Sequence, residues 1–228
     1  RRWVKVRIKY DFEFWAVLFV RIKNKTGDSD IPFRLNRPQR RLLSELEDMR
    51  TKRLPIRLIL LKARQWGGST LVQMYMAWIQ LGHRKNWNSV ICAHLKDAAA
   101  NIKGMYSKLL ENYPAWLIDA DKPLKFQPYE KMGNTSVIAE TGCKVTIGSA
   151  ETPESVRGSD AVMAHLSEVA FWPHTRLKSP ESLIRSVCGS VALLPDSVVV
   201  MESTANGTGN YFHQECERAK SENSPILN

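Results

Sequence analysis

The sequence predicts an α/β fold, with a mostly parallel twisted sheet and helices on both of its faces. Short apolar runs, typical of buried strands, alternate with longer segments in which apolar residues recur at the helical period. Three of the apolar runs end in polar segments, at residues 62–69, 167–168 and 203–206. Ligands of such sheets bind at the carboxyl ends of the strands, so these three segments predict a binding site.

The composition indicates the class of protein and of partner. At 228 residues, 43% hydrophobic and 25% charged, the chain suits a soluble globular protein of one large or two small domains. The formal net charge of +10 favours an acidic partner such as nucleic acid over a basic surface with no dedicated ligand. Four widely spaced cysteines and five histidines without metal-ligand spacing predict reduced thiols and no structural zinc.

The first part of the chain is strongly basic. Residues 1–23 alternate basic with apolar or aromatic side chains, which predicts an amphipathic strand, or a strand and a turn, at the domain edge. We therefore expect residues 1–35 to form a basic strand or lid segment. A helix is expected to follow Asn36, a possible N-cap, with Pro38 in its first turn.

The centre of the chain has the layout of a phosphate-binding loop. An apolar strand at residues 58–61 leads into a polar turn and then into an apolar-periodic helix. The backbone N–H groups of Gly67, Gly68 and Ser69 would open this helix, where unpaired donors and the helix dipole favour an anion. The alternative is an ordinary strand-to-helix turn that carries a surface lysine and arginine.

The match to the pattern G-x-x-x-x-G-K-[ST] is partial. Gly67 takes the place of the second glycine, and Ser69 supplies the hydroxyl that would contact Mg²⁺. Gly68 occupies the position of the usual lysine, and Lys62 that of the first glycine. The lysine is thus expected to act from six residues earlier in the chain.

The remaining elements are predicted from the same periodicities and include one antiparallel hairpin about a Thr-Gly turn. In chain order they are a strand at 89–94, a helix at 96–113, an irregular connection at 114–135, hairpin strands at 135–140 and 144–149, a strand at 161–166, a helix at 180–188, a strand at 198–201 and a helix at 209–219.

Several polar residues near the expected strand ends suit nucleoside triphosphate hydrolysis. Glu168 could orient the attacking water, although a solvent-facing glutamate is the alternative. Ser167 stands where an aspartate usually precedes this glutamate and could bond a Mg²⁺-bound water. Arg64 could reach the γ-phosphate or pair with Glu168. Arg157, on a polar loop, could act on a neighbouring subunit's nucleotide or be simply solvated, and Gln39 could read an adenine edge or be a solvated helix-start residue.

Four segments together resemble a known family: KARQWGGST, VRGSD, HLSEVAFW and ESTANGTGNYF. They resemble the ATPase domain of the large terminase subunit, the DNA-packaging motor of tailed bacteriophages, over residues 32–212. The resemblance implies a P-loop NTPase domain over residues 36–220, followed by a frayed tail at 221–228. It implies Gln39 as the adenine contact and Arg157 as a candidate trans-acting arginine finger.

Residue chemistry and resemblance together define the candidate site. The catalytic candidates are Glu168, Lys62, Arg64 and Arg157; the nucleotide-binding candidates are Gln39, Lys62, Ala63, Arg64, Gln65, Trp66, Gly67, Gly68, Ser69 and Thr70; the coupling residues are Ser203, Thr204 and Ala205; and the Mg²⁺ candidates are Ser69, Glu168 and, through water, Ser167.

The resemblance also implies an activity and partners. It implies a motor that uses ATP and Mg²⁺, forms a ring, expected to be a pentamer, and drives double-stranded DNA into a procapsid. The implied partners are the portal protein and the small terminase subunit, in the host cytoplasm and without a membrane. The nuclease domain of such proteins is expected to be absent. The alternatives are a helicase or DNA-remodelling ATPase of related fold, and a nucleotide- or DNA-binding module with impaired hydrolysis.

Overall fold

The computed structural model describes residues 2–221 apart from residues 25, 26, 28, 130, 131, 159, 177 and 190. The strands are β1 (Arg21–Lys23), β2 (Asp30–Pro32), β3 (Ile56–Leu61), β4 (Ser89–Ala93), β5 (Phe126–Tyr129), β6 (Met132–Ile138), β7 (Cys143–Ser149), β8 (Met163–Ser167) and β9 (Val198–Ser203). The helices are α1 (Arg2–Tyr10), α2 (Phe12–Phe19), α3 (Arg37–Thr51), α4 (Gly68–Gly82), α5 (Lys96–Glu111), α6 (Pro180–Cys188) and α7 (Tyr211–Lys220), with short 3-10 turns at Ala115–Ile118, Pro153–Ser155 and Val169–Phe171.

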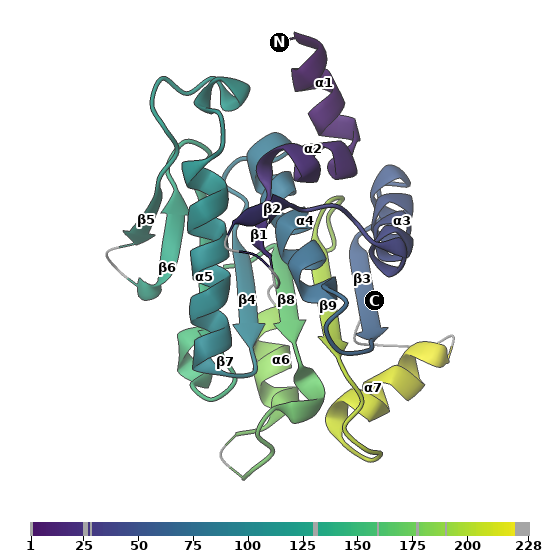
Figure 1. Cartoon of the computed structure of the whole chain (residues 1–228). Helices are drawn as coiled ribbons and strands as arrows, with labels where there is room; N and C mark the ends of the chain where they lie inside the picture. Colours follow the sequence, from purple (N-terminus) through teal and green to yellow (C-terminus); the bar gives the residue numbers. More distant parts are fainter. Residues whose placement is uncertain are drawn as a thin grey trace.

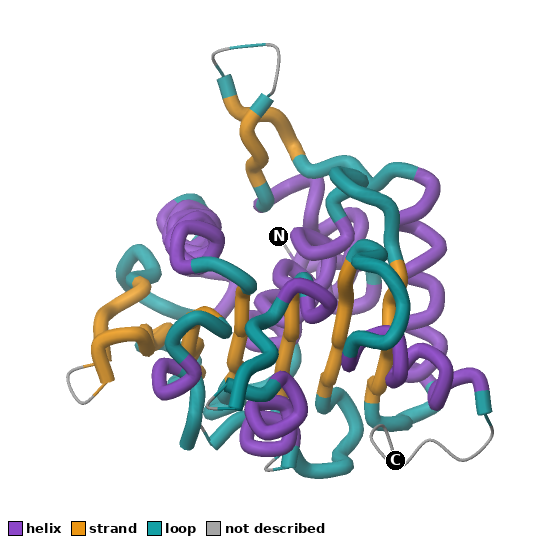
Figure 2. The backbone as a smooth tube through the Cα atoms, turned by 90° about the horizontal axis from the view of Figure 1, so that it is seen from below, coloured by secondary structure: helices purple, strands orange, loops and turns teal. Residues whose placement is uncertain are grey.

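Seven of these strands form one sheet in the order β3-β9-β8-β4-β7-β6-β5. The five strands from β3 to β7 in this order are parallel, whereas β6 is antiparallel to both of its neighbours. Helices cover both faces of the sheet (Figure 1, Figure 2). The predicted fold class and the antiparallel hairpin are therefore confirmed.

The sheet is buried on both faces because successive side chains of a strand point to opposite sides. In β9, Val198 and Val200 pack in the core beneath α4, whereas Val199 and Met201 pack with the side chains of α6 and α7. The same alternation determines on which side of the sheet the side chain of each polar residue at a strand end lies.

The prediction of a strand over residues 1–23 was wrong, because most of this segment is helical. Asp11 caps α2, and its side chain accepts a hydrogen bond from the Phe14 amide. The buried side chains of α2 follow the helical spacing i, i+3, i+4, i+7: Phe12, Trp15, Ala16 and Phe19. The basic residues that interrupt the apolar ones produced an apparent two-residue period, but burial of the aromatic rings follows the helical period.

The N-terminal helices join the main core and do not form an edge strand. The Trp78 indole N–H donates to the Ile8 carbonyl at 2.6 Å, which places the end of α1 against the C-terminal half of α4. The domain division at residues 35 and 220 stays a prediction, and residues 222–228 of the expected tail lie outside the described residues. Among the described residues, no helix is both long enough and apolar enough to span a bilayer.

One predicted irregular segment contains regular structure. Residues 114–135 were expected to be a connection, but they hold β5 and the beginning of β6. These strands extend the sheet beyond β7 as an antiparallel edge. Proline and lysine in this segment obscured the strand pattern, since both are tolerated on edge strands and depleted elsewhere.

Candidate active site

The loop between β3 and α4 turns at Gly67, whose backbone is left-handed with φ 80°. That conformation favours glycine, and a Cβ atom at Gly67 would lie 2.6 Å from the Gln39 side-chain nitrogen. Conformation and available space therefore both require glycine here. The first N–H groups of an α-helix have no partner inside the helix, so the start of α4 after this turn offers donors that could bind an anion.

This loop is held by Gln39, in the first turn of α3, and by Asn36, the N-cap residue of the same helix. Gln39 Nε2 donates to the Gly67 carbonyl at 3.0 Å, while Gln39 Oε1 accepts from the Asn36 amide in a capping box. The Asn36 side chain donates to the Trp66 carbonyl at 3.0 Å. Gln39 is only 3% exposed, so the structure gives it a role in positioning the loop. Its contact with adenine stays a prediction.

Trp66 lies close to Gly68 in this loop. A Cβ atom at Gly68 would lie 2.7 Å from the Trp66 ring, so a side chain at position 68 would require the indole to shift. The lysine of this region is Lys62, directly after β3, and its contact with phosphate stays a prediction.

Lys62 joins the ends of three adjacent strands. Its Nζ lies 2.6 Å from Glu168 Oε1, after β8, and 3.0 Å from Glu202 Oε2, on β9. Its amide donates to the Ser203 carbonyl at 3.0 Å and so extends the pairing of β3 with β9. The Lys62 side chain is 6% exposed. The predicted meeting of the polar strand ends at residues 62, 168 and 203 is thus observed.

Glu168 is held by the predicted coupling segment. The amide and hydroxyl of Thr204 each donate to Glu168 Oε2 at 3.2 Å, and the Ser203 hydroxyl donates to the same oxygen at 3.4 Å. Burial alone would raise the pKa of Glu168, but hydrogen bonds from Lys62 and the Thr204 amide outweigh burial and hold this pKa below its usual value. Glu168 is therefore ionised at neutral pH, in a left-handed backbone conformation with φ 56°.

Glu202 is the main site residue that sequence reasoning missed. Its side chain is fully buried, and its Oε1 accepts from the hydroxyls of Ser69 at 2.7 Å and Ser167 at 2.6 Å. His165 Nε2 lies 3.5 Å from the same oxygen. Burial and then Lys62 lower the pKa of His165 to about 3, so the ring is neutral. The sequence did hold one indication of this position. Side chains of a strand alternate between its two faces, so Glu202 lies on the same face of β9 as Val200, beneath α4.

The donor groups suit a Mg²⁺ ion that is shared with a nucleotide. Among the described residues, no group of three or more His, Cys, Asp or Glu side chains could hold a metal ion alone. Nucleotide-bound Mg²⁺ needs less, because phosphates and water supply most of its ligands beside one or two carboxylates. The Ser69 hydroxyl lies against Glu202, whose buried Oε2 forms an ion pair with Lys62 at 3.0 Å. A buried carboxylate with the hydroxyls of Ser69 and Ser167 beside it is an acidic set of oxygen atoms that fits the ion.

A pocket of about 360 Å³ opens beside Glu168. Its lining residues are Arg64, Gln65, His94, Glu168, Phe171 and Thr204. His94 and Phe171, whose rings lie 5.9 Å apart, form an aromatic wall that the sequence did not reveal. The neighbouring loop residue Ala63 is exposed, and Thr70 is half-buried in the first turn of α4. The exposed Arg64 thus lines the same pocket as Glu168, and its contact with a γ-phosphate or with Glu168 stays a prediction.

Two predicted residues lie away from this cluster. Arg157 forms an ion pair with Glu154 at 3.4 Å and lines a small pocket beside Trp172. Ala205 lies beyond Thr204 and lines a separate pocket against α7. No contact between Arg157 and Lys62 is observed among the described residues, and the role of Arg157 as a trans-acting finger stays a prediction.

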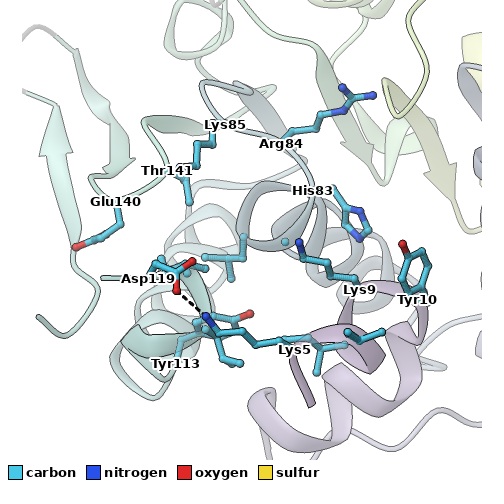
Figure 3. Close-up of a pocket in the computed structure, with 16 residues that line it drawn as sticks. Lys5, Lys9, Tyr10, His83, Arg84, Lys85, Tyr113, Asp119, Glu140 and Thr141 are labelled. Atoms are coloured by element: carbon cyan, nitrogen blue, oxygen red, sulfur yellow. Dashed lines mark hydrogen bonds and ion pairs between the residues drawn. The ribbon is translucent and has the colours of Figure 1, made fainter. Parts of the chain in front are cut away.

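A larger cavity, of about 560 Å³, lies at the opposite end of the sheet (Figure 3). Its lining includes Lys5, Lys9 and His83, and Lys5 is paired with Asp119. His83 directly follows α4, whose 15 residues span about 22 Å at 1.5 Å per residue. The length of α4 therefore separates this cavity from the Gly67 loop, so it is not the predicted nucleotide site.

Comparison with solved structures identifies the fold. The chain superposes on the HK97 bacteriophage large terminase with a TM-score of 0.68 and 17% sequence identity, covering 96% of this chain and 42% of that one. It also matches the ATPase domain of the Thermus phage P74-26 large terminase, with a TM-score of 0.46, 19% identity and coverage of 75% and 66%. The sequence matches no protein-family model and no curated protein. The chain therefore has the fold of the HK97 protein and spans less than half of its length.

Proposed function

We propose that this chain is the ATP-hydrolysing motor domain of a viral DNA-packaging terminase, which couples hydrolysis to the translocation of double-stranded DNA. One observation carries the proposal: Lys62 and Glu168, from two different strand ends, meet at 2.6 Å beside the glycine turn that opens α4. An ammonium group and a carboxylate beside a helix N-terminus support this proposal, because phosphoryl transfer needs a cation for the phosphates and a group that orients the attacking water. The fold shared with the HK97 large terminase supports the same assignment.

Nucleotide binding would change the partner of Lys62. The phosphate oxygens compete with Glu168 for the Lys62 ammonium group, while the N–H groups at the start of α4 bind the phosphate chain. A triphosphate that takes the Lys62 contact releases Glu168 Oε1 from its ion pair. Substrate binding itself thus frees the carboxylate that must act on water.

Glu168 is the general base in this proposal. It lies in the pocket beside Arg64, where it can accept a proton from the attacking water and where Arg64 can stabilise charge on the transferring phosphoryl group. Bound Mg²⁺ would neutralise charge on the phosphates, with Ser69 as its hydroxyl contact and Ser167 nearby. The site therefore supports ATP and Mg²⁺ as substrate and cofactor.

The bonds from Thr204 and Ser203 to Glu168 supply a route for coupling. A movement of the Glu168 carboxylate alters three hydrogen bonds to the end of β9. The Ser203 hydroxyl also accepts from the Ala170 amide, so the segment after β8 is linked to the same group. Displacement of the carboxylate during the reaction is therefore transmitted to two strand ends.

The partners follow from charge and from the shared fold. A net charge of +10 favours sequence-independent contact with duplex phosphates. Ring assembly, with five copies, and docking to a portal protein and a small terminase subunit in the host cytoplasm belong to the same proposal.

Steady-state ATP turnover with and without linear duplex DNA tests the function. We expect Mg²⁺-dependent phosphate release that duplex DNA stimulates, with stimulation falling as salt rises because counterion release drives binding. A helicase would in addition separate strands, and we expect no strand separation. Nucleotide binding without any turnover would instead indicate a binding module.

Arg157 provides a test of assembly. If Arg157 acts on the nucleotide of a neighbouring subunit, Arg157→Ala alone is expected to lose about 10³-fold or more in turnover, as trans-acting arginines contribute 10³–10⁵. Mixing it with Glu168→Gln subunits is expected to restore measurable turnover, because mixed rings contain interfaces with both intact groups. Phosphate release across mixing ratios measures this, and inactivity at every ratio would assign Arg157 a role within its own subunit.

A further inference from the structure

Glu202 is a fully buried glutamate at the end of β9, directly under the loop that opens α4. We propose that Glu202 supplies the acidic charge of the Mg²⁺ site and orients the Ser69 hydroxyl toward the ion, in place of an aspartate at position 167. This inference rests on the proposed ATPase function and names a positioning residue that acts through Ser69 and Ser167.

The hydrogen bonds set the direction of the Ser69 hydroxyl. Ser69 Oγ donates its proton to Glu202 Oε1 at 2.7 Å, so its lone pairs point away from Glu202 and are available to a cation. Ser167 Oγ donates to the same oxygen at 2.6 Å. One carboxylate oxygen therefore organises both hydroxyls that the sequence had suggested as metal contacts.

The strand register explains how Glu202 can replace a carboxylate at position 167. Ser167 and Glu202 are direct partners in the parallel pairing of β8 with β9. Neighbouring strands lie about 4.8 Å apart, and glutamate reaches one methylene further than aspartate. The carboxylate of Glu202, on β9, can thus lie beside Ser167 Oγ. An aspartate at position 167, on β8, would bring its carboxylate to the same region.

The charge balance points to a cation. Lys62 is the ammonium group that faces both carboxylates, at 2.6 Å from Glu168 and 3.0 Å from Glu202. Glu202 Oε2 is fully buried, and the charged partner observed for it among the described residues is this same Lys62 ammonium group. A buried charge that a single lysine shares between two acids is costly unless another positive group offsets it. A divalent ion beside Ser69 would supply that charge.

The test compares three variants with the wild-type chain. Glu202→Gln keeps the shape and removes the charge; S167D/E202Q returns a carboxylate to β8; and Glu215→Gln, another fully buried glutamate, on α7, controls for loss of a buried acid. Binding of a fluorescent, non-hydrolysable ATP analogue is measured without metal and across a Mg²⁺ titration, and Mn²⁺ binding is followed by electron paramagnetic resonance. Thermal melting confirms the fold of each variant.

We expect Glu202→Gln to raise the Mg²⁺ and Mn²⁺ midpoints about 10–100-fold, the range seen when outer groups of a metal site are removed. Metal-free analogue binding should change by less than about threefold, S167D/E202Q should recover most of the metal affinity, and Glu215→Gln should match wild type. An unchanged metal midpoint in Glu202→Gln, or weaker binding that is equal with and without metal, would overturn the inference.

The outcomes also separate this inference from the proposed function. A wild-type chain that binds no analogue under any condition would refute the function and the inference together. Metal-dependent binding by wild type with an unaltered midpoint in Glu202→Gln would refute the inference alone. If Glu202→Gln does not fold, S167D/E202Q decides: a midpoint near wild type supports the assignment, and a folded double variant without metal dependence overturns it.

Discussion

Replacing Glu168 with glutamine is expected to reduce ATP turnover by about 10²–10⁴-fold, the usual contribution of a positioned general base. The amide cannot accept the proton of the attacking water. Binding of ATP should be retained or tightened, because Lys62 loses its ion-pair partner at 2.6 Å and becomes available to phosphate. Phosphate release and equilibrium binding of ATP, measured on the same preparation, separate the two effects.

The matched control is Glu181→Gln, which removes a half-exposed carboxylate from α6. Its turnover should equal that of wild type, since exposed ion pairs contribute little. Wild-type turnover in Glu168→Gln would remove Glu168 from the mechanism and leave Arg64 and bound metal as the sources of catalysis.

Replacing Lys62 with alanine is expected to weaken ATP binding by about 10–150-fold, corresponding to the 1.5–3 kcal/mol of a hydrogen bond to a charged group. The same change leaves the buried Glu202 carboxylate without its ammonium partner. The thermal midpoint should therefore fall, because removing one member of a buried ion pair leaves an uncompensated charge. Equilibrium binding, measured well below the new melting temperature, isolates the effect on the nucleotide.

Arg64→Ala serves as the comparison for Lys62→Ala. Arg64 is exposed and lines the pocket, so its loss should leave the melting temperature unchanged and weaken binding less. Unaltered ATP affinity in Lys62→Ala together with a large loss in Arg64→Ala would transfer the phosphate contact to Arg64.

The sequence was sufficient to predict the helices and strands in which the spacing of apolar residues is unambiguous. The helix predicted at residues 180–188 has the observed bounds, and the strand, glycine turn and helix around Gly67 lie where expected. The segment at residues 1–23 failed because charged side chains between aromatic residues resemble a two-residue period. Only burial against α4 reveals the helical spacing.

In the candidate site, too, some contacts could be predicted from the sequence and others could not. Lys62, Glu168 and Ser203 could be predicted to meet, since parallel strands bring their carboxyl ends to one edge of the sheet. Glu202 could not be assigned, because its role depends on which strand pairs with β9 and in what register. The contact of Gln39 with the Gly67 carbonyl depends likewise on packing between α3 and the loop, which no local pattern encodes.

The pairing of Ser167 with Glu202 has a consequence for motif searches. A search that demands an acidic residue immediately before a glutamate in the position of Glu168 passes over this chain. Glu202 stands directly across from that position on the neighbouring strand. A search that accepts an acidic residue at either of these two paired positions would retain the chain.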